Sequence, residues 1–323
     1  MARDKRLIIG GTLLVLILTF TLIAQLADES QLKPLSQLTR FYGGSGSAHE
    51  PIGPSDGLES VLGNITPAEE DGFTLIAPSW KRLNTLPDWI KHYASGDIPS
   101  LRRMIIIWPK VQGDAPTSLL ENVTQSNYPI PVIIDQREVN TLNGRFLKID
   151  AIKTNSVLAM DDDMLYDPKD VEFGYQVWRE FGQRERMSGF IARATNKDNT
   201  AYNIGGLKSY SMILTKSAWF HTDWMHAYWS QDERMTRLRK YVDDHMNCED
   251  ILLAFIHAHH TRKSPLYVKP YKMVDTGMKD GISAAGDHLK HRAACVSKFA
   301  EEFGQDTLVS SDAVFQRMLD NYG

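Results

Sequence analysis

The sequence lacks any large excess of charge of one sign. Its 323 residues hold 36 Lys and Arg against 40 Asp and Glu, which gives a formal net charge of −4. A protein that grips nucleic acid through its phosphates needs a basic surface, so this balance argues against nucleic acid as a partner. Internal repeats are also absent. The hydrophobic content of 42% is ordinary for a globular protein and is enough for a sizeable core.

Cysteine is scarce. The chain has two, Cys248 and Cys295, so only one intramolecular pairing exists. Disulfides persist in oxidising compartments such as the lumen of the secretory pathway. If the body of the chain lies in such a lumen, we expect the two cysteines to be bonded.

One long hydrophobic run lies near the N-terminus. Residues 7–26 carry no charge, and a run of about 20 apolar residues crosses a hydrocarbon core. Arg3, Lys5 and Arg6 precede the run, and positive charge on this side favours a cytoplasmic N-terminus. A cleaved signal peptide is the alternative, but its apolar region is usually about 7–15 residues long. We therefore predict a cytoplasmic tail over 1–6 and a single-pass type II signal-anchor over 7–26, in the Golgi or endoplasmic reticulum membrane.

The composition changes after this run. Residues 27–71 include a Gly-Gly-Ser-Gly-Ser segment at 43–47, which is linker composition that buries no core. We predict a flexible stem over 27–71 and a folded, lumenal body over 72–323. Two Asn-x-Thr sequons, at Asn64 and Asn122, are candidates for glycosylation in that compartment.

Within the body, apolar runs alternate with amphipathic stretches. Strands rich in Ile, Val and Leu are predicted at residues 73–77, 104–108, 131–134 and 156–160, with further candidates at 187–193 and 211–215. Helices are predicted between the first two strands, from Asp167-Pro168 onward, and from Asn247 onward. This alternation indicates an α/β fold with a mainly parallel sheet, in which ligands bind beyond the carboxyl ends of the strands.

An acidic triplet, Asp161–Asp163, directly follows the predicted strand 156–160. Adjacent carboxylates repel one another unless a cation lies among them, and a divalent ion shared with substrate phosphates meets that need. An acidic turn is the structural alternative, but the residues at 164–166, Met-Leu-Tyr, are not a turn sequence. A phosphatase with an aspartyl nucleophile is disfavoured because Leu165 stands where it normally has Thr or Val, and because about three strands come earlier.

Several stretches together resemble a known family. They are residues 73–76 (Phe-Thr-Leu-Ile), 140–145 (Asn-Thr-Leu-Asn-Gly-Arg), the triplet, 210–212 (Tyr-Ser-Met), 247–250 (Asn-Cys-Glu-Asp), 255–256 (Phe-Ile), 268–270 (Val-Lys-Pro) and 292–295 (Arg-Ala-Ala-Cys). In this ordered set, the body resembles the glycosyltransferase family 64 domain, the C-terminal catalytic domain of exostosins and exostosin-like proteins. The resemblance implies a GT-A-type fold with a Rossmann-like, mainly parallel sheet. It also implies a UDP-sugar donor, a Mn²⁺ ion or another divalent cation, and transfer with retention of anomeric configuration. A family-based expectation is an N-acetylhexosamine moved to a glycan or glycolipid acceptor.

The resemblance assigns roles at the nucleotide end. Asn140 and Arg145 match contacts to the nucleotide, and Arg82 matches a basic residue that faces the same nucleotide after the first strand. The chain departs from the family at Pro78 and Pro109, where the family often has Gln and Asn. Proline also removes a backbone hydrogen-bond donor at each position.

The triplet and the sugar end receive roles in the same way. Asp161 and Asp162 would meet the ribose and the uracil or sugar, and Asp163 would hold the metal between the donor phosphates.

Asn247 and Asp250 match residues beside the transferred sugar, and Arg292 matches an arginine near the diphosphate leaving group. Taken without the family, Asn247 and Asp250 are equally a helix N-cap followed by an acid in the first turn.

Other features have plainer interpretations. The aromatic run at 219–229 lines an acceptor groove or belongs to the core, and core is favoured because aromatic side chains dominate buried area. His257, His259 and His260 lack the spacing of a zinc helix and are interpreted as ordinary helix residues. The alternative to an enzyme is a catalytically silent relative of the same fold that binds sugar or nucleotide without transfer.

Overall fold

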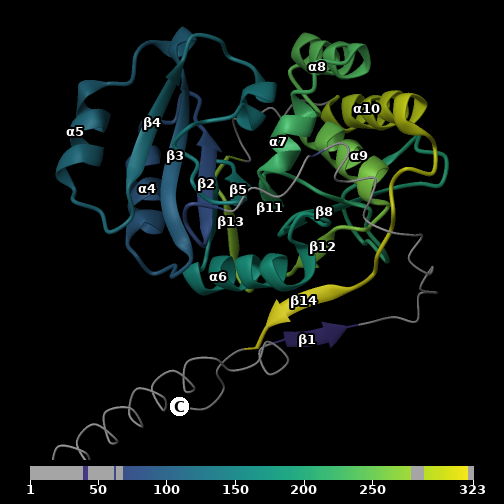
Figure 1. The fold of residues 1–323 in the computed structure, drawn as a ribbon, viewed down its shortest axis with the longest axis horizontal. Coiled ribbons are helices and arrows are strands. Elements are labelled where there is room, and N and C mark those ends of the chain that lie inside the picture. The colour runs from purple at the N-terminus through teal and green to yellow at the C-terminus, as the bar shows by residue number, and fades with distance from the viewer. Residues whose placement is uncertain (1–38, 43–61, 63–67, 278–286, 319–323) are drawn as a thin grey trace, which may run out of the picture. The chain divides into compact units, whose positions relative to one another are not determined.

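The computed structural model describes residues 39–42, 62, 68–277 and 287–318 (Figure 1). Almost all of them belong to one compact unit, Phe41–Arg317. The strand β1 (Thr39–Tyr42) crosses the boundary of this unit, and the other elements lie inside it.

Helices and strands alternate along the unit. Its helices are α4 (Leu86–Ala94), α5 (Thr117–Gln125), α6 (Pro168–Val177), α7 (Asp223–Tyr228), α8 (Glu233–His245), α9 (Glu249–Thr261) and α10 (His288–Phe303), with two short 3-10 helices, η1 (Lys110–Gln112) and η2 (Leu142–Phe146), and a short π-helix, η3 (Trp178–Gly182). Its strands are β2 (Phe73–Pro78), β3 (Leu101–Pro109), β4 (Val132–Arg137), β5 (Ser156–Met160), β6 (Met164–Tyr166), β7 (Ser188–Gly189), β8 (Ala192–Thr195), β9 (Tyr202–Asn203), β10 (Met212–Ile213), β11 (Ser217–His221), β12 (Leu266–Val268), β13 (Met273–Asp275) and β14 (Val314–Arg317).

The main sheet is mostly parallel. Within the unit its strand order is β14-β12-β7-β11-β5-β2-β3-β4. Strands β5, β2, β3 and β4 run parallel to one another, and β12 runs parallel to both β7 and β14, whereas β11 is antiparallel to β5 and β7. Two small sheets, β10-β8-β9 and β13-β6, stand beside it. The predicted α/β architecture with a mainly parallel sheet is confirmed.

Both faces of the sheet are covered, which explains why a central strand such as β5 is buried along its whole length. Along β5, Leu158 and Met160 belong to one buried cluster, and Val157 and Ala159 belong to a second. Side chains alternate across a strand, so the two clusters are the two faces of one sheet. Helices α4 and α6 pack in the first cluster, and α7, α8, α9 and α10 pack in the second (Figure 1).

The first four predicted strands are confirmed as β2, β3, β4 and β5, with ends shifted by up to three residues. The next candidate, 187–193, was too long. It is divided into β7 in the main sheet and β8 in a small sheet. A Cβ added at Gly189 would lie 2.3 Å from the carbonyl oxygen of Ser217, so the backbones touch there before the chain turns away. The candidate at 211–215 is reduced to β10, which pairs only with β8.

The helix predicted from Asn247 onward is present as α9, but Asn247 is neither its first residue nor its N-cap. Helix α9 begins at Glu249, and its N-cap is Cys248 in the left-handed region at φ 79°, with no side-chain cap. The side-chain oxygen of Asn247 accepts a hydrogen bond from Arg292 instead, at 3.1 Å. The Asn247 side chain therefore does not cap the helix, and it lines the cleft described below.

The aromatic run at 219–229 belongs to the core. Trp219, Phe220, Trp224 and Tyr228 are each fully buried, and none of the run lines the main cleft. His257 packs its ring against Trp224, with ring centroids 4.8 Å apart. The core interpretation of this run is confirmed.

Several predictions fall on residues outside the described ranges. These are the anchor at 7–26, nearly all of the stem at 27–71, and the sequon at Asn64. In the described part of the chain, no helix combines the length and apolar character that crossing a bilayer requires. The second sequon residue, Asn122, lies half-buried in α5 and accepts a hydrogen bond from the Tyr128 hydroxyl at 3.2 Å.

The expected bond between Cys248 and Cys295 is present and joins the start of α9 to α10. The two residues are 47 apart in sequence, and a cross-link closing a loop of that size stabilises a fold by about 4 kcal/mol on the chain-entropy model. We expect the free energy of unfolding of the Cys248→Ser, Cys295→Ser double variant, measured by denaturant titration, to be lower than that of the wild type by about 4 kcal/mol. A reducing agent should lower the stability of the wild type and leave the double variant unchanged. Recovery of both residues as free thiols in non-reducing peptide mapping would contradict the bond.

Candidate active site

A cleft of about 1700 Å³ opens where β2, β3, β4 and β5 end. It lies beyond the carboxyl ends of the parallel strands, where ligands of α/β proteins bind. Every residue predicted for donor, metal or catalysis lines it, and these are Arg82, Asn140, Arg145, Asp161, Asp162, Asp163, Asn247, Asp250 and Arg292. The prolines that depart from the family pattern, Pro78 and Pro109, line it as well.

Asp162 is held by the loop that follows β2. Its carboxylate accepts hydrogen bonds from the Ser79 hydroxyl at 2.7 Å and from Arg82 Nη1 at 2.9 Å. Burial raises the pKa of Asp162 to about 6, and the nearby Arg82 opposes this shift. Arg82 is thus the first cation that neutralises the triplet.

Asp163 faces two cations and a glycine. Its Oδ2 lies 2.6 Å from Arg82 Nη1 and its Oδ1 lies 3.6 Å from Lys216 Nζ. Burial raises the pKa of Asp163, and the charge of Asp161 adds to that rise. A Cβ on Gly277 would stand 1.8 Å from Asp163 Oδ2, so a residue with a side chain at 277 would displace this carboxylate.

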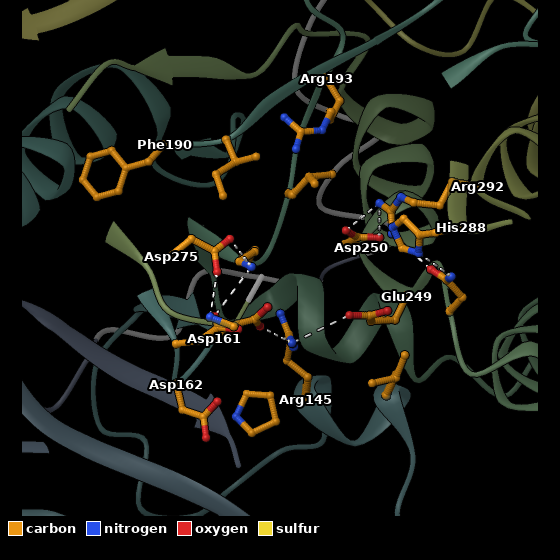
Figure 2. Close-up of a pocket in the computed structure, with 18 of the residues that line it drawn as sticks. Arg145, Asp161, Asp162, Phe190, Arg193, Glu249, Asp250, Asp275, His288 and Arg292 are labelled. Atoms are coloured by element: carbon orange, nitrogen blue, oxygen red, sulfur yellow. Dashed lines mark hydrogen bonds and ion pairs between the residues drawn. The ribbon is translucent and has the colours of Figure 1, made fainter. Parts of the chain in front are cut away.

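Arg145 connects the triplet to the far end of the cleft (Figure 2). It is buried, donates to Asp161 Oδ1 at 2.6 Å and to the Thr215 carbonyl at 2.7 Å, and lies 3.8 Å from Glu249 Oε1. Burial alone would lower the pKa of Arg145, but the charges of Asp161 and Glu249 raise it. A single buried guanidinium therefore holds two carboxylates in one network, Asp161 directly after β5 and Glu249 at the start of α9.

Asp250 and Arg292 form a buried ion pair in which one guanidinium nitrogen contacts both carboxylate oxygens (Figure 2). Arg292 Nη2 donates to Asp250 Oδ1 at 2.9 Å and to Oδ2 at 2.7 Å, while Nη1 donates to Asn247. The guanidinium also lies 4.6 Å from the ring centroid of Tyr202. Burial opposes ionisation of Asp250, yet Arg292 lowers its pKa, so this carboxylate stays charged.

Three contributing residues were missed by sequence reasoning. Glu249 stands beside Asp250 and is as deeply buried. Lys216 lies among acids at the cleft wall, with its Nζ 2.8 Å from Asp275 Oδ2 and 3.6 Å from Asp163 Oδ1. The adjacent Asp250 was a usable signal for Glu249. No sequence motif around Lys216 or Asp275 indicated a role in the site. The two residues are far from the triplet in the sequence, and only the folding of the chain brings them close to it.

The residues at the triplet fit a divalent cation. Asp163 Oδ1 is a buried carboxylate oxygen without a hydrogen-bond partner among the described residues, and it is a hard donor of the type such ions prefer. No group of three or more His, Cys, Asp or Glu side chains in the described part of the chain would complete a coordination shell. An ion here would take its remaining ligands from water and from the phosphates of a bound nucleotide.

Comparison with known proteins identifies the class. Residues 73–319 match the Glycosyl transferase family 64 domain. The chain belongs to this family, and its folded body is a glycosyltransferase domain.

Individual relatives include proteins from plants and animals. The chain is 35% identical over 242 residues to rice glucosamine inositolphosphorylceramide transferase 1, a match that covers 72% of this chain and 31% of the rice protein. It is 32% identical over 267 residues to glycosylinositol phosphorylceramide mannosyl transferase 1 of Arabidopsis thaliana, covering 77% of this chain and 78% of that protein. It is 30% identical over 250 residues to human exostosin-2, covering 74% and 33%. The match thus spans about a third of the rice protein and of exostosin-2.

Glu249 makes the stability of the fold depend on pH. Burial, together with the charge of Asp250, raises the pKa of Glu249 to about 7, whereas an unfolded chain has a Glu pKa of about 4.3. The folded state keeps a proton that the unfolded state releases, so stability is lost as pH rises from about 4.3 through 7. We expect the free energy of unfolding of the wild type, relative to Glu249→Gln, to fall by up to about 3 kcal/mol over that range. Denaturant titrations at several pH values measure this, and a constant difference between the two proteins would contradict it.

Proposed function

We propose that this chain is a retaining, metal-dependent glycosyltransferase that moves a sugar from a UDP-sugar donor to a glycan or glycolipid acceptor in the secretory pathway. The observation that carries the proposal is one cleft with the acidic triplet at one end and the Asp250–Arg292 pair at the other, joined by Arg145, in a family 64 domain. An N-acetylhexosamine is the proposed sugar.

The donor nucleotide is proposed to bind at the β2–β5 end of the cleft. Arg82 and Arg145 offer planar guanidinium groups, which match the oxygens of a diphosphate. Asp163 would hold the cation, which when bound would neutralise charge on the donor phosphates. Arg82 is ion-paired with the carboxylates of Asp162 and Asp163. We expect Arg82 to leave these carboxylates and to bind the donor phosphates when a nucleotide and its cation enter.

Retention fits the chemistry of Asp250. Both oxygens of this carboxylate accept hydrogen bonds from Arg292, and Oδ1 also accepts one from the backbone N–H of Ile251. A carboxylate so engaged is held anionic and in place, which suits stabilisation of positive charge developing at the anomeric carbon. It suits covalent attack less well, because attack would break its bonds to Arg292. We therefore assign Asp250 an electrostatic role while the acceptor attacks from the face that the diphosphate leaves. Arg292 is proposed to stabilise the departing diphosphate.

We propose a glycolipid with a polar headgroup as the acceptor. The names of two relatives describe transfer to inositolphosphorylceramides, which favours a glycolipid over a free glycan. The predicted type II anchor, with the body in the lumen of the Golgi or endoplasmic reticulum, agrees with such an acceptor. A silent sugar-binding relative is the competing function, and release of UDP separates the two.

The purified chain should release UDP from a UDP-N-acetylhexosamine only in the presence of Mn²⁺ or a similar ion. Asp163→Asn removes one charge and one oxygen donor for that ion, so we expect release to fall by about 10²-fold or more. The exposed Asp150→Asn is the matched control and should be unaffected. Activity that persists in EDTA would contradict the metal role, and no UDP release from any donor in a panel would favour the silent relative.

Asp250→Asn should lower kcat by about 10²-fold, with a smaller effect on donor KM, because the lost interaction forms mainly in the transition state. It also leaves Arg292 buried without its counter-charge, which costs about 3–5 kcal/mol of stability. The double variant Asp250→Asn, Arg292→Gln removes both charges, so thermal stability should recover while activity stays low. Recovery of activity along with stability would mean that the pair is structural only.

A further inference from the structure

Lys216 places an ammonium group beside the acidic triplet. The residue stands directly before β11, and its backbone carbonyl accepts a hydrogen bond from the N–H of Asp161 at 3.0 Å. Its Nζ lies 2.8 Å from Asp275 Oδ2 and 3.6 Å from Asp163 Oδ1. Two acids in the described part of the chain thus face one ammonium group, and Asp275 is the one within ordinary hydrogen-bond distance (Figure 2).

Asp275 is held in place from the other side of the triplet. It ends β13, which pairs with β6, the strand directly after the triplet. Its Oδ1 accepts a hydrogen bond from the N–H of Gly277 at 3.0 Å, and its Oδ2 accepts from Lys216. The N–H of Thr276 donates to the Asp163 carbonyl at 2.9 Å. The backbones that carry Lys216 and Asp275 are therefore both bonded to the triplet, which fixes the ion pair relative to Asp163.

The position of Lys216 leaves one oxygen of Asp163 without a hydrogen bond. Asp163 Oδ2 contacts Arg82, whereas the buried Oδ1 has no hydrogen-bond partner among the described residues. A hydrogen bond from an ammonium to a carboxylate is about 2.7–2.9 Å long, so a shift of about 1 Å would bring the Lys216 ammonium onto Oδ1. Attraction between unlike charges, which is stronger in partly buried surroundings than in water, favours that shift. The bond to Asp275 opposes it.

A lysine bonded to Asp163 Oδ1 would interfere with a divalent cation. The ammonium and the cation would compete for the same carboxylate oxygen, and their like charges would repel each other. An ammonium held to one side still offsets the mutual repulsion of the triplet carboxylates, and it leaves the oxygen available. The geometry of Lys216 and Asp275 thus provides positive charge beside the triplet without blocking the proposed ligand.

We propose that Asp275 is a positioning residue, which holds the Lys216 ammonium away from Asp163 Oδ1 and so keeps that oxygen open to a divalent cation. The proposal rests on the proposed function, because it takes Asp163 as a ligand of the cation. It gives neither Lys216 nor Asp275 a contact with the cation. Asp275 acts through Lys216, and this dependence is what the experiment measures.

Binding of Mn²⁺ in the presence of UDP tests the proposal without measuring transfer. The full chain in detergent is titrated with Mn²⁺ at a fixed excess of UDP, and free Mn²⁺ is read from its EPR signal. The Asp163→Asn variant, which lacks the proposed ligand charge, gives the background. Asp275→Asn keeps the size of the side chain but weakens its hold on Lys216, so the ammonium should move onto Asp163 Oδ1. We expect the Kd for Mn²⁺ to rise by about 10-fold or more.

A double-mutant cycle with Lys216→Met separates this role from a direct one. Without the ammonium, Asp275→Asn should change the Kd by less than about 2-fold, and the double variant should bind Mn²⁺ at least as tightly as the wild type. Glu138→Gln is the matched control. It weakens another Lys–acid pair with an N–O distance of 2.8 Å, Lys110–Glu138, whose two residues do not line the cleft, and it should leave the Kd unchanged.

The possible failures are distinguishable. An unchanged Kd in Asp275→Asn would overturn the proposal and leave the proposed function standing. An equal loss of affinity with and without Lys216 would also overturn it, because Asp275 would then contact the cation directly or support the local fold. If the wild type binds no more Mn²⁺ than Asp163→Asn does, the metal role of Asp163 fails and this inference fails with it.

Discussion

The buried ion pair between Asp250 and Arg292 is the interaction on which the rest of the cleft depends. Two charges removed from water are costly unless each finds near-complete replacement for its hydration. Here the carboxylate accepts two hydrogen bonds from Arg292 Nη2 and one from the backbone N–H of Ile251, while Asn247 accepts from Nη1 and the Tyr202 ring lies against the guanidinium. That geometry requires the start of α9 and the first turns of α10 to stay fixed side by side, and the Cys248–Cys295 bond fixes them.

From this pair, acids and cations are interleaved across the cleft. Glu249 lies next to Asp250 in the sequence, Arg145 lies between Glu249 and Asp161, and Arg82 spans the remaining two acids of the triplet. Every acid at the bottom of the cleft thus has a cation near it before any ligand arrives. In the proposed function, a diphosphate with its cation would bring both signs of charge into this array, so it would replace internal partners without leaving a buried charge alone. We propose this exchange as the physical reason for so many clustered charges in the cleft.

The sequence was sufficient for much of the fold. Strands buried on both faces contain unbroken apolar runs, so β2, β3, β4 and β5 were found. The start of β3 and the end of β4 were missed by three residues because they carry charged side chains, such as Arg102, Arg103 and Arg137. The triplet was found because three acids after such a strand conflict electrostatically. Strand β11 was not predicted, because its aromatic residues are equally typical of a buried helix and a buried strand. Its antiparallel place between β5 and β7 depends on pairing with residues far away in the sequence. Asn247 was misread as a possible helix cap because its partner, Arg292, is 45 residues away along the chain. Family resemblance supplied the residue roles that spacing alone left open.

The stereochemistry of the first product tests the central claim most directly. The claim is that Asp250, held anionic by Arg292, stabilises the anomeric centre while the acceptor attacks from the face that the diphosphate leaves. Proton NMR, recorded early in the reaction of an α-linked UDP-N-acetylhexosamine with an accepted glycolipid, reports the anomeric configuration from the coupling of the anomeric proton. The account predicts an α-linked product. A β-linked product would show attack from the opposite face, which requires a general base there, and it would contradict the roles given to Asp250 and Arg292.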